Sequence, residues 1–221
     1  MPVPARIVTL LTDFGTRDHY VASMKGVLLG IEPRLQVIDV SHDVPKFGVR
    51  RAAITLAQAA KFFPRGTVHV AVVDPGVGTP RKHLILETKR FFFVGPDNGV
   101  LSIAAEEDGI KGAYEIRGSR YVFQERSNTF AGRDVFAPAA AHLAKGLPPE
   151  RLGEEIDPSE IKKVGIGEPR KSGRRVEGEI LAIDEFGNLV TNITRSLVGE
   201  LKFGKAITGK VGGSSLKVPF L

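Results

Sequence analysis

An aspartate and an arginine flank a glycine-rich loop that follows a strongly apolar segment. Residues 67–73, Thr-Val-His-Val-Ala-Val-Val, are rich in β-branched side chains and predict a strand buried on both faces. Asp74 comes directly after them, and Arg81 follows a loop that contains Gly76 and Gly78, which let backbone amides approach a bound group. A guanidinium folded back over Asp74 favours the ionised carboxylate. A structural ion pair that closes the turn is an equally good interpretation.

Asp13 occupies the same kind of position earlier in the chain, at the end of an apolar segment. The elements expected before the central strand are a strand over 7–11, a helix over 20–31, a strand over 35–40 and a helix over 49–60. This alternation predicts a mainly parallel sheet with right-handed crossovers. Ligands of such sheets bind beyond the carboxyl ends of the strands, so Asp13 and Asp74 are expected at one edge.

Further elements are expected downstream of this loop. They are strands over 83–88, 91–94 and 112–117, a short helix through 97–105 and a helix over 135–145. Asp97 and Asn98 are expected to cap the short helix, and Asp18 to cap the helix over 20–31. Asp134 suits the dipole at the start of the last helix.

The composition changes after residue 147, where proline, glycine, glutamate and lysine become frequent. Short alternating segments over 176–183, 189–193, 206–211 and 216–220 then predict strands joined by glycine turns. We therefore expect an α/β domain over 1–163 with helices flanking its sheet, a linker over 164–175 and a small all-β domain over 176–221. The segment Val218-Pro219-Phe220-Leu221 reads as an interrupted strand.

The composition excludes several classes of protein. The 221 residues include no cysteine, which excludes disulfides and thiolate chemistry. No apolar segment approaches the ~20 residues of a membrane span, and the N-terminus is not a signal peptide, so a cytoplasmic protein without membrane contact is expected. The net charge of +6 is scattered along the chain, so we expect no nucleic-acid partner. The histidines show no metal-ligand spacing, and no metal is expected.

Six blocks of residues occur in an order that matches a known family. They are Thr12-Asp13-Phe14-Gly15 with Asp18 and Tyr20-Val21, Ser41-His42-Asp43-Val44, Asp74-Pro75-Gly76-Val77-Gly78-Thr79 with Arg81, Pro96-Asp97-Asn98-Gly99, Phe130-Ala131-Gly132-Arg133-Asp134, and Asp184-Glu185-Phe186-Gly187-Asn188 with Thr191-Asn192-Ile193. Over essentially its whole length the chain resembles the adenosine-forming S-adenosylmethionine hydrolases, also called SAM hydroxide adenosyltransferases. These enzymes are related to fluorinase and chlorinase.

The resemblance implies hydrolysis of S-adenosylmethionine to adenosine and L-methionine by attack of water or hydroxide on the 5′ carbon. Sulfonium is a good leaving group, so the enzyme has to hold and partly deprotonate a water in line with the carbon–sulfur bond. By resemblance, Asp74 orients this water or accepts its proton, and Arg81 stabilises the developing hydroxide. No cofactor is implied.

The third member of the family's catalytic set is missing. The family motif is Phe-His-Gly-Arg-Asp, and this chain has Ala131 where the histidine belongs. Loss of one acid/base group commonly costs ~10²–10⁴-fold in rate, so slow hydrolysis is expected. The alternatives are a protein that binds S-adenosylmethionine or adenosine without turnover and, less favoured because Asp74 opposes anion binding, a halogenase.

The resemblance also implies substrate contacts in both domains. Asp13 would accept hydrogen bonds from the ribose hydroxyls, Phe47 would lie against the ribose, and Tyr20 and Gly132 would complete this part of the site.

In the C-terminal domain, Asp184 would hold the methionine ammonium, while Phe186 and Asn188 would stack on and hydrogen-bond to adenine. On the residues alone, Phe186-Gly187-Asn188 reads as a hairpin turn. Members of the family continue past the equivalent of Leu221 with further strands, so the resemblance implies a truncated C-terminal domain in this chain. Members of the family are trimers with sites between the N-terminal domain of one subunit and the C-terminal domain of the next, and we expect the same here.

Overall fold

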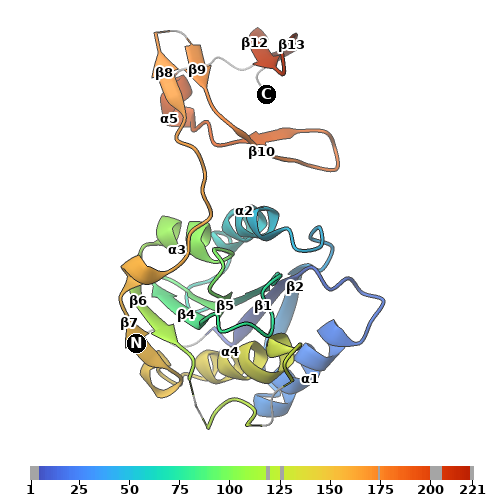
Figure 1. The fold of residues 1–221 in the computed structure, drawn as a ribbon, viewed down its shortest axis with the longest axis vertical. Coiled ribbons are helices and arrows are strands. Elements are labelled where there is room, and N and C mark those ends of the chain that lie inside the picture. Colours follow the sequence, from blue (N-terminus) through green and yellow to red (C-terminus); the bar gives the residue numbers. More distant parts are fainter. Residues whose placement is uncertain (1–4, 118–119, 125–126, 174, 200–205, 220–221) are drawn as a thin grey trace. The chain divides into compact units, whose positions relative to one another are not determined.

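The chain forms two compact units, Met1–Val164 and Gly165–Leu221. The structure, a computed structural model, describes residues 5–117, 120–124, 127–173, 175–199 and 206–219 (Figure 1). Within these residues, no helix has the length and apolar character needed to cross a membrane.

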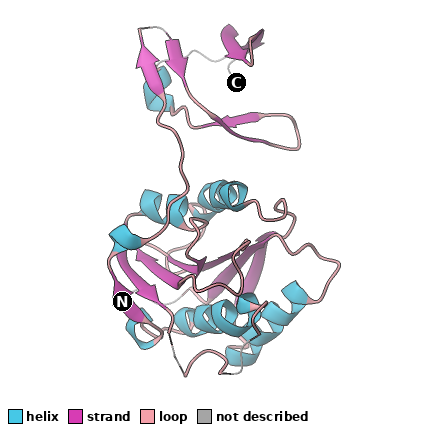
Figure 2. Cartoon of the chain, in the orientation of Figure 1, coloured by secondary structure: helices cyan, strands magenta, loops and turns pink. Residues whose placement is uncertain are grey.

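The N-terminal unit is built on a seven-stranded sheet with the order β2-β1-β3-β5-β4-β6-β7. Figure 2 shows the strands of this sheet in magenta between layers of cyan helices. Its strands are β1 (Ile7–Thr12), β2 (Gln36–Ser41), β3 (Val68–Val72), β4 (His83–Thr88), β5 (Phe92–Pro96), β6 (Ile110–Glu115) and β7 (Glu154–Ile156). Strands β2, β1, β3 and β5 are parallel neighbours, whereas β4 is antiparallel to both β5 and β6, and β7 is antiparallel to β6. The expected mainly parallel sheet is confirmed.

Helices cover both faces of this sheet. They are α1 (Tyr20–Ile31), α2 (Val49–Ala60), α3 (Ser102–Asp108) and α4 (Ala137–Ala144), the last preceded by a π-helical turn, η1 (Gly132–Phe136). Helices α1 and α4 lie on one face and α2 and α3 on the other (Figure 1). Along β3, Val68, Val70 and Val72 pack with the first pair of helices, while Ala71 packs with the second pair. This strand is therefore buried on both faces, as its sequence predicts.

Two of the expected helix caps are wrong. Helix α1 begins after His19, which makes no side-chain cap hydrogen bond, so Asp18 is not its cap. Helix α3 begins only at Ser102 with Leu101 at the N-cap, so Asp97 and Asn98 precede the helix by several residues. The side chains of Asp97 and Asn98 hydrogen-bond to other segments of the unit, because tertiary partners compete with the helix end for them.

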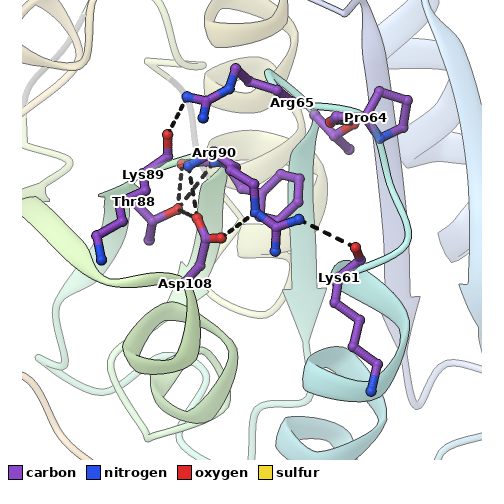
Figure 3. Close-up of polar contacts among 9 residues, drawn as sticks. Lys61, Pro64, Arg65, Thr88, Lys89, Arg90 and Asp108 are labelled. Atoms are coloured by element: carbon purple, nitrogen blue, oxygen red, sulfur yellow. Dashed lines mark hydrogen bonds and ion pairs between the residues drawn. The ribbon is translucent and has the colours of Figure 1, made fainter.

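A buried carboxylate ties the turn between β4 and β5 to two helix ends (Figure 3). Asp108, at the end of α3, accepts hydrogen bonds from Thr88 Oγ1 at 2.7 Å and from Arg90 N and Nε at 2.8 and 2.6 Å. Arg90 Nη1 in turn donates to the carbonyl of Lys61, after the end of α2, at 3.3 Å. Burial alone raises the pKa of Asp108, but these hydrogen bonds outweigh it and hold the pKa below its ordinary value.

The C-terminal unit consists of three antiparallel strand pairs and one short helix in its described residues. The pairs are β8 (Arg170–Ser172) with β9 (Arg175–Glu177), β10 (Ile180–Ile183) with β11 (Leu189–Thr191), and β12 (Ala206–Val211) with β13 (Ser214–Pro219); the helix is α5 (Arg195–Val198). Strand β8 lies inside the range 164–175 that was expected to be a linker. Phe220 and Leu221, at the end of the last expected strand, lie outside the described residues.

Candidate active site

Asp74 and Arg81 form a buried two-point ion pair just beyond the end of β3. Arg81 Nε donates to Asp74 Oδ1 at 2.7 Å and Arg81 Nη2 donates to Asp74 Oδ2, and each side chain is only 6% exposed. The backbone N–H of Gly76 also donates to Asp74 Oδ1, at 3.2 Å. These contacts fix the plane of the carboxylate.

Arg81 keeps its charge and one unused donor in this buried place. Burial lowers the pKa of Arg81 to about 10, so the guanidinium stays protonated at neutral pH. Its Nη1 atom is buried and has no hydrogen-bond partner within the described residues. A buried donor without a partner is costly, and a bound polar group would satisfy it.

The loop between Asp74 and Arg81 lies against the segment that leads to Ala131. Gly78 has φ = +81°, and a Cβ there would lie 2.9 Å from the carbonyl oxygen of Asn128. Only glycine suits both the backbone conformation and this close approach. Asn128 therefore lies beside the ion pair's loop, although it is 50 residues away from Gly78 in the sequence.

Ala131 is buried immediately before η1, the π-helical turn that replaces the start of the expected α-helix. Asp134 anchors this segment, because it accepts hydrogen bonds from Ser127 N at 2.7 Å and from Arg133 Nε and Nη2 at 2.6 and 3.0 Å. The sequence had suggested only a role at the helix dipole for Asp134. Single π-helical turns are frequent at functional sites.

Asp13 and Phe47 are brought together at the same sheet edge. Thr12 of β1 is paired in register with Val72 of β3, so Asp13 and the segment that leads to Asp74 leave the sheet side by side. The buried Asp13 accepts a hydrogen bond through Oδ2 from Phe47 N at 2.8 Å. Phe47 has φ = +60° and is 66% exposed. Such a conformation is rare for a bulky residue and marks functional loops.

His42 supports the Asp13 loop, a role that the sequence did not predict. Its Nδ1 lies 2.9 Å from Thr12 Oγ1, and its carbonyl accepts a hydrogen bond from Gly15 N at 2.8 Å. Its Nε2 lies 3.0 Å from Asp39 Oδ1. The signals in the sequence were its position directly after β2, the strand that neighbours β1, and its place in the block Ser41-His42-Asp43-Val44.

Tyr20 and Gly132 meet in an aromatic cluster next to Ala131. The ring of Tyr20 lies 5.6 Å from that of Phe14 and 5.0 Å from that of Phe130, measured between centroids. A Cβ on Gly132 would lie 3.1 Å from Met24 Sδ and 3.3 Å from Phe130 Cε2, so a larger residue would displace this cluster. Tyr20 and Gly132 thus lie against Phe130, which precedes Ala131, and Phe47 is bonded to Asp13 at the sheet edge that also carries Asp74.

Asp184, Phe186 and Asn188 form a tight turn between β10 and β11. Asp184 Oδ1 accepts from the backbone N–H groups of Phe186 at 2.9 Å and Asn188 at 2.8 Å, and its Oδ2 accepts from Asn188 Nδ2 at 2.8 Å. Gly187 supplies the required positive φ of +85°. The hairpin turn that the residues alone suggest is present, with Phe186 92% exposed. The substrate contacts of these three residues stay a prediction.

No group of three or more histidine, aspartate or glutamate side chains in the described ranges is arranged to hold a metal ion.

Comparison with known proteins gives consistent matches over both units. Residues 8–153 match the family model described as the SAM hydroxide adenosyltransferase N-terminal domain, and residues 178–219 match the model of the C-terminal domain. The chain is 40% identical to an (R)-S-adenosyl-L-methionine hydrolase of Salinispora tropica over 90% of this chain and 76% of that protein. It is 42% identical to another from Thermus thermophilus, covering 88% of this chain and 77% of the relative.

More distant relatives and a solved structure agree. A fluorinase of an Actinoplanes species is 31% identical over 86% of this chain and 72% of its own length. The crystal structure of an uncharacterized conserved protein from Thermotoga maritima superposes with a TM-score of 0.90 at 40% identity, covering 95% of this chain and 81% of that one. The chain belongs to the SAM hydroxide adenosyltransferase family.

Proposed function

We propose that this protein hydrolyses S-adenosyl-L-methionine to adenosine and L-methionine. The observation that carries the proposal is the buried two-point pair of Asp74 and Arg81, in a chain whose relatives at about 40% identity are (R)-S-adenosyl-L-methionine hydrolases. A charged carboxylate and a charged guanidinium held at the carboxyl edge of a mainly parallel sheet are suited to orient one water molecule.

In the proposed reaction, the oxygen of this water attacks the 5′ carbon of the adenosyl group. The new carbon–oxygen bond forms as the carbon–sulfur bond breaks, and the bonding electron pair leaves with the sulfur as neutral methionine thioether. Asp74 orients the water and accepts its proton, and Arg81 stabilises the negative charge that develops on the attacking oxygen. Nη1 of Arg81, which has no hydrogen-bond partner in the part of the chain that the structure describes, is a donor that such an oxygen can use.

We further propose that the rate is reduced by Ala131, whose methyl group neither orients water nor exchanges a proton. Residue 131 is buried beside the aromatic cluster, shortly after Asn128, whose carbonyl lies against Gly78 in the ion pair's loop. Loss of a single general acid or base commonly lowers a rate by ~10²–10⁴-fold.

Substrate binding in this proposal uses residues of both units. Asp13 accepts hydrogen bonds from the ribose hydroxyls and Phe47 lies against the ribose, with Tyr20 and Gly132 beside them. From the other unit, Asp184 binds the methionine ammonium, and Phe186 and Asn188 bind adenine. We propose a homotrimer in which each site combines the N-terminal domain of one subunit with the C-terminal domain of the next; sedimentation velocity gives the subunit number directly.

The second candidate function is binding of S-adenosylmethionine or adenosine without turnover, and Ala131 is the observation that favours it. The test measures by chromatography how fast the parent chain, Ala131→His and Ala131→Asn each form adenosine from S-adenosylmethionine. The asparagine is polar and of similar size but does not exchange a proton at neutral pH. A large gain in rate with histidine alone supports an impaired hydrolase. Tight binding without adenosine release in all three proteins supports the binder.

A further inference from the structure

Asp97 and Asn98 contact both ends of the loop that carries the ion pair. Asn98 Nδ2 donates a hydrogen bond to the carbonyl of Val73 at 2.8 Å, and Val73 directly precedes Asp74. The backbone N–H of Asp97 donates to the carbonyl of Lys82 at 3.0 Å, and Lys82 directly follows Arg81. The dipeptide Asp97-Asn98 thus bonds to the carbonyl before Asp74 and to the carbonyl of the residue after Arg81.

This dipeptide is itself rigid. It follows β5, whose last residue, Pro96, is paired with His83 of β4. Asn98 Oδ1 accepts from Val100 N at 3.1 Å, so the side-chain amide of Asn98 uses its donor toward Val73 and its acceptor within its own turn. A side-chain amide whose nitrogen and oxygen are both hydrogen-bonded is held in one orientation. Asn98 therefore fixes the end of β3 relative to the end of β5.

The last residues of the N-terminal unit pack onto the same turn. Lys162 N donates to the buried Asp97 carboxylate at 2.8 Å, and Val164 N donates to Ser102 Oγ at 3.1 Å. A Cβ on Gly99 would lie 2.9 Å from both Val164 N and Val164 Cγ2, so the two segments are in close contact. Ser102, the first residue of α3, directly follows the same turn, but its hydroxyl bonds to Gly99 and Val164 and lies outside the contacts with the loop of residues 73–82.

We propose that Asn98 is a positioning residue for the hydrolytic site: its side-chain amide, bonded to Val73, sets where the Asp74 carboxylate stands relative to Arg81. The expected effect of Asn98 on the rate rests on the proposed hydrolysis. Its expected effect on the geometry of Asp74 and Arg81 does not. Asp97 assists from the side of Arg81, since its negative charge raises the pKa of Arg81 against the larger effect of burial.

The rate effect follows from the sensitivity of in-line displacement to geometry. A misplacement of about 1 Å at a distance from the reacting atoms can cost ~10²-fold in rate. Without the Asn98 amide, the Val73 carbonyl loses this donor, and the end of β3 that leads to Asp74 loses its side-chain link to the turn after β5. We therefore expect kcat to fall while KM changes little, because Asn98 is not among the proposed substrate contacts.

The test compares Asn98→Ala, Asn98→Ser and Ser102→Ala. Serine can still accept the Val100 N–H and keep the turn, but it is too short to reach the Val73 carbonyl. Ser102→Ala removes two hydrogen bonds from the same turn and serves as the matched control, with kcat unchanged. Asn98→Ala and Asn98→Ser are expected to lower kcat by ~10–100-fold, with KM within a factor of about three. Thermal unfolding reports whether each variant is folded.

A second readout does not depend on activity. Hydrogen exchange of the Arg81 Nε–H, followed by NMR, reports its bond to Asp74 Oδ1, and it is expected to become about tenfold faster in Asn98→Ser but not in Ser102→Ala. Parental exchange at Arg81 in a folded Asn98→Ser overturns the proposal. If the parent and Ala131→His release no adenosine, the proposed hydrolysis fails, and the Arg81 exchange rates still decide the role of Asn98.

Discussion

Arg81 contacts both oxygens of Asp74 through two different nitrogens, across a loop of six residues, with both side chains almost completely removed from solvent. Such a pair keeps its geometry because water hardly reaches either charge and so cannot replace the partner. Breaking it from one side leaves a buried charge behind.

The stability of the ion pair can be tested with single and double substitutions. Arg81→Met leaves the buried carboxylate uncompensated and is expected to lower the free energy of unfolding by about 3–5 kcal/mol. Asp74→Asn combined with Arg81→Met removes both charges and is expected to recover part of that loss. Urea unfolding measures both values. A double variant as unstable as Arg81→Met alone would contradict this account. Neither variant is expected to release adenosine.

Gly78 is expected to be intolerant of a side chain. Gly78→Ala places a methyl group 2.9 Å from the Asn128 carbonyl at a positive φ, so we expect a loss of ~1–2 kcal/mol in the free energy of unfolding. Gly26, exposed on α1 with open space within 4 Å of the position a Cβ would take, is the control. Gly26→Ala is expected to stabilise the protein by ~0.5–1 kcal/mol because alanine is the better helix former. Equal effects at the two positions would show that the Asn128 contact does not matter.

Asp13 is expected to matter for binding and not for folding. Asp13→Asn keeps an oxygen that accepts the Phe47 N–H but loses the second carboxylate acceptor for ribose hydroxyls. The affinity for adenosine, measured by calorimetry, is expected to fall ~10–100-fold, as for hydrogen bonds to a charged group. The melting temperature should stay close to that of the parent. Unchanged affinity would place the ribose elsewhere.

His69 is expected to make the fold less stable in acid. Its Nδ1 lies 2.8 Å from Thr9 Oγ1, its ring is surrounded by Phe63, Phe91 and Phe93, and burial lowers its pKa to about 3. In the unfolded chain a histidine takes up a proton near pH ~6.5, so the unfolded state binds more protons between these two values. Stability therefore falls as the pH drops from about 6.5 to 3, by up to ~1.4 kcal/mol per pH unit.

Urea unfolding as a function of pH checks this effect. In His69→Asn, the free energy of unfolding should fall less steeply with decreasing pH below about pH 6.5, because the contribution of His69 is removed. An NMR titration of the ring that shows protonation of His69 in the folded protein above about pH 5 would contradict the prediction.

Asp108 is expected to stabilise the turn between β4 and β5 above acidic pH. Because its pKa is lowered in the folded state, its contribution is present above the unfolded value near ~4 and is lost as the pH falls through the folded value. Asp108→Asn retains the shape but loses the charge that Arg90 contacts, and is expected to cost ~1–3 kcal/mol at neutral pH. The difference between parent and variant should shrink in acid, and a constant difference would argue against a role for the charge.

The amino-acid sequence by itself determined most of the local elements and the family, although not the helix caps. Helices α1 and α2 occupy the expected ranges, because their apolar periodicity is a property of neighbouring residues. The apolar segment over 67–73 is long enough for one strand only. Arg81 follows Asp74 closely enough in the sequence for the two side chains to meet. Six ordered blocks were sufficient to recognise the SAM hydroxide adenosyltransferase family.

Only the tertiary structure decided how distant segments meet. The insertion of β4 between β5 and β6, the approach of Asn128 to Gly78 and the bond from Asn98 to Val73 join residues that are 25 to 50 positions apart or belong to different strands. Asp97 and Asn98 were expected to cap a helix because their residue types suit that role. The hydrogen-bond partners of a side chain are the groups that tertiary packing brings close to it. The neighbouring residues in the sequence do not reveal these partners, because they come from distant segments.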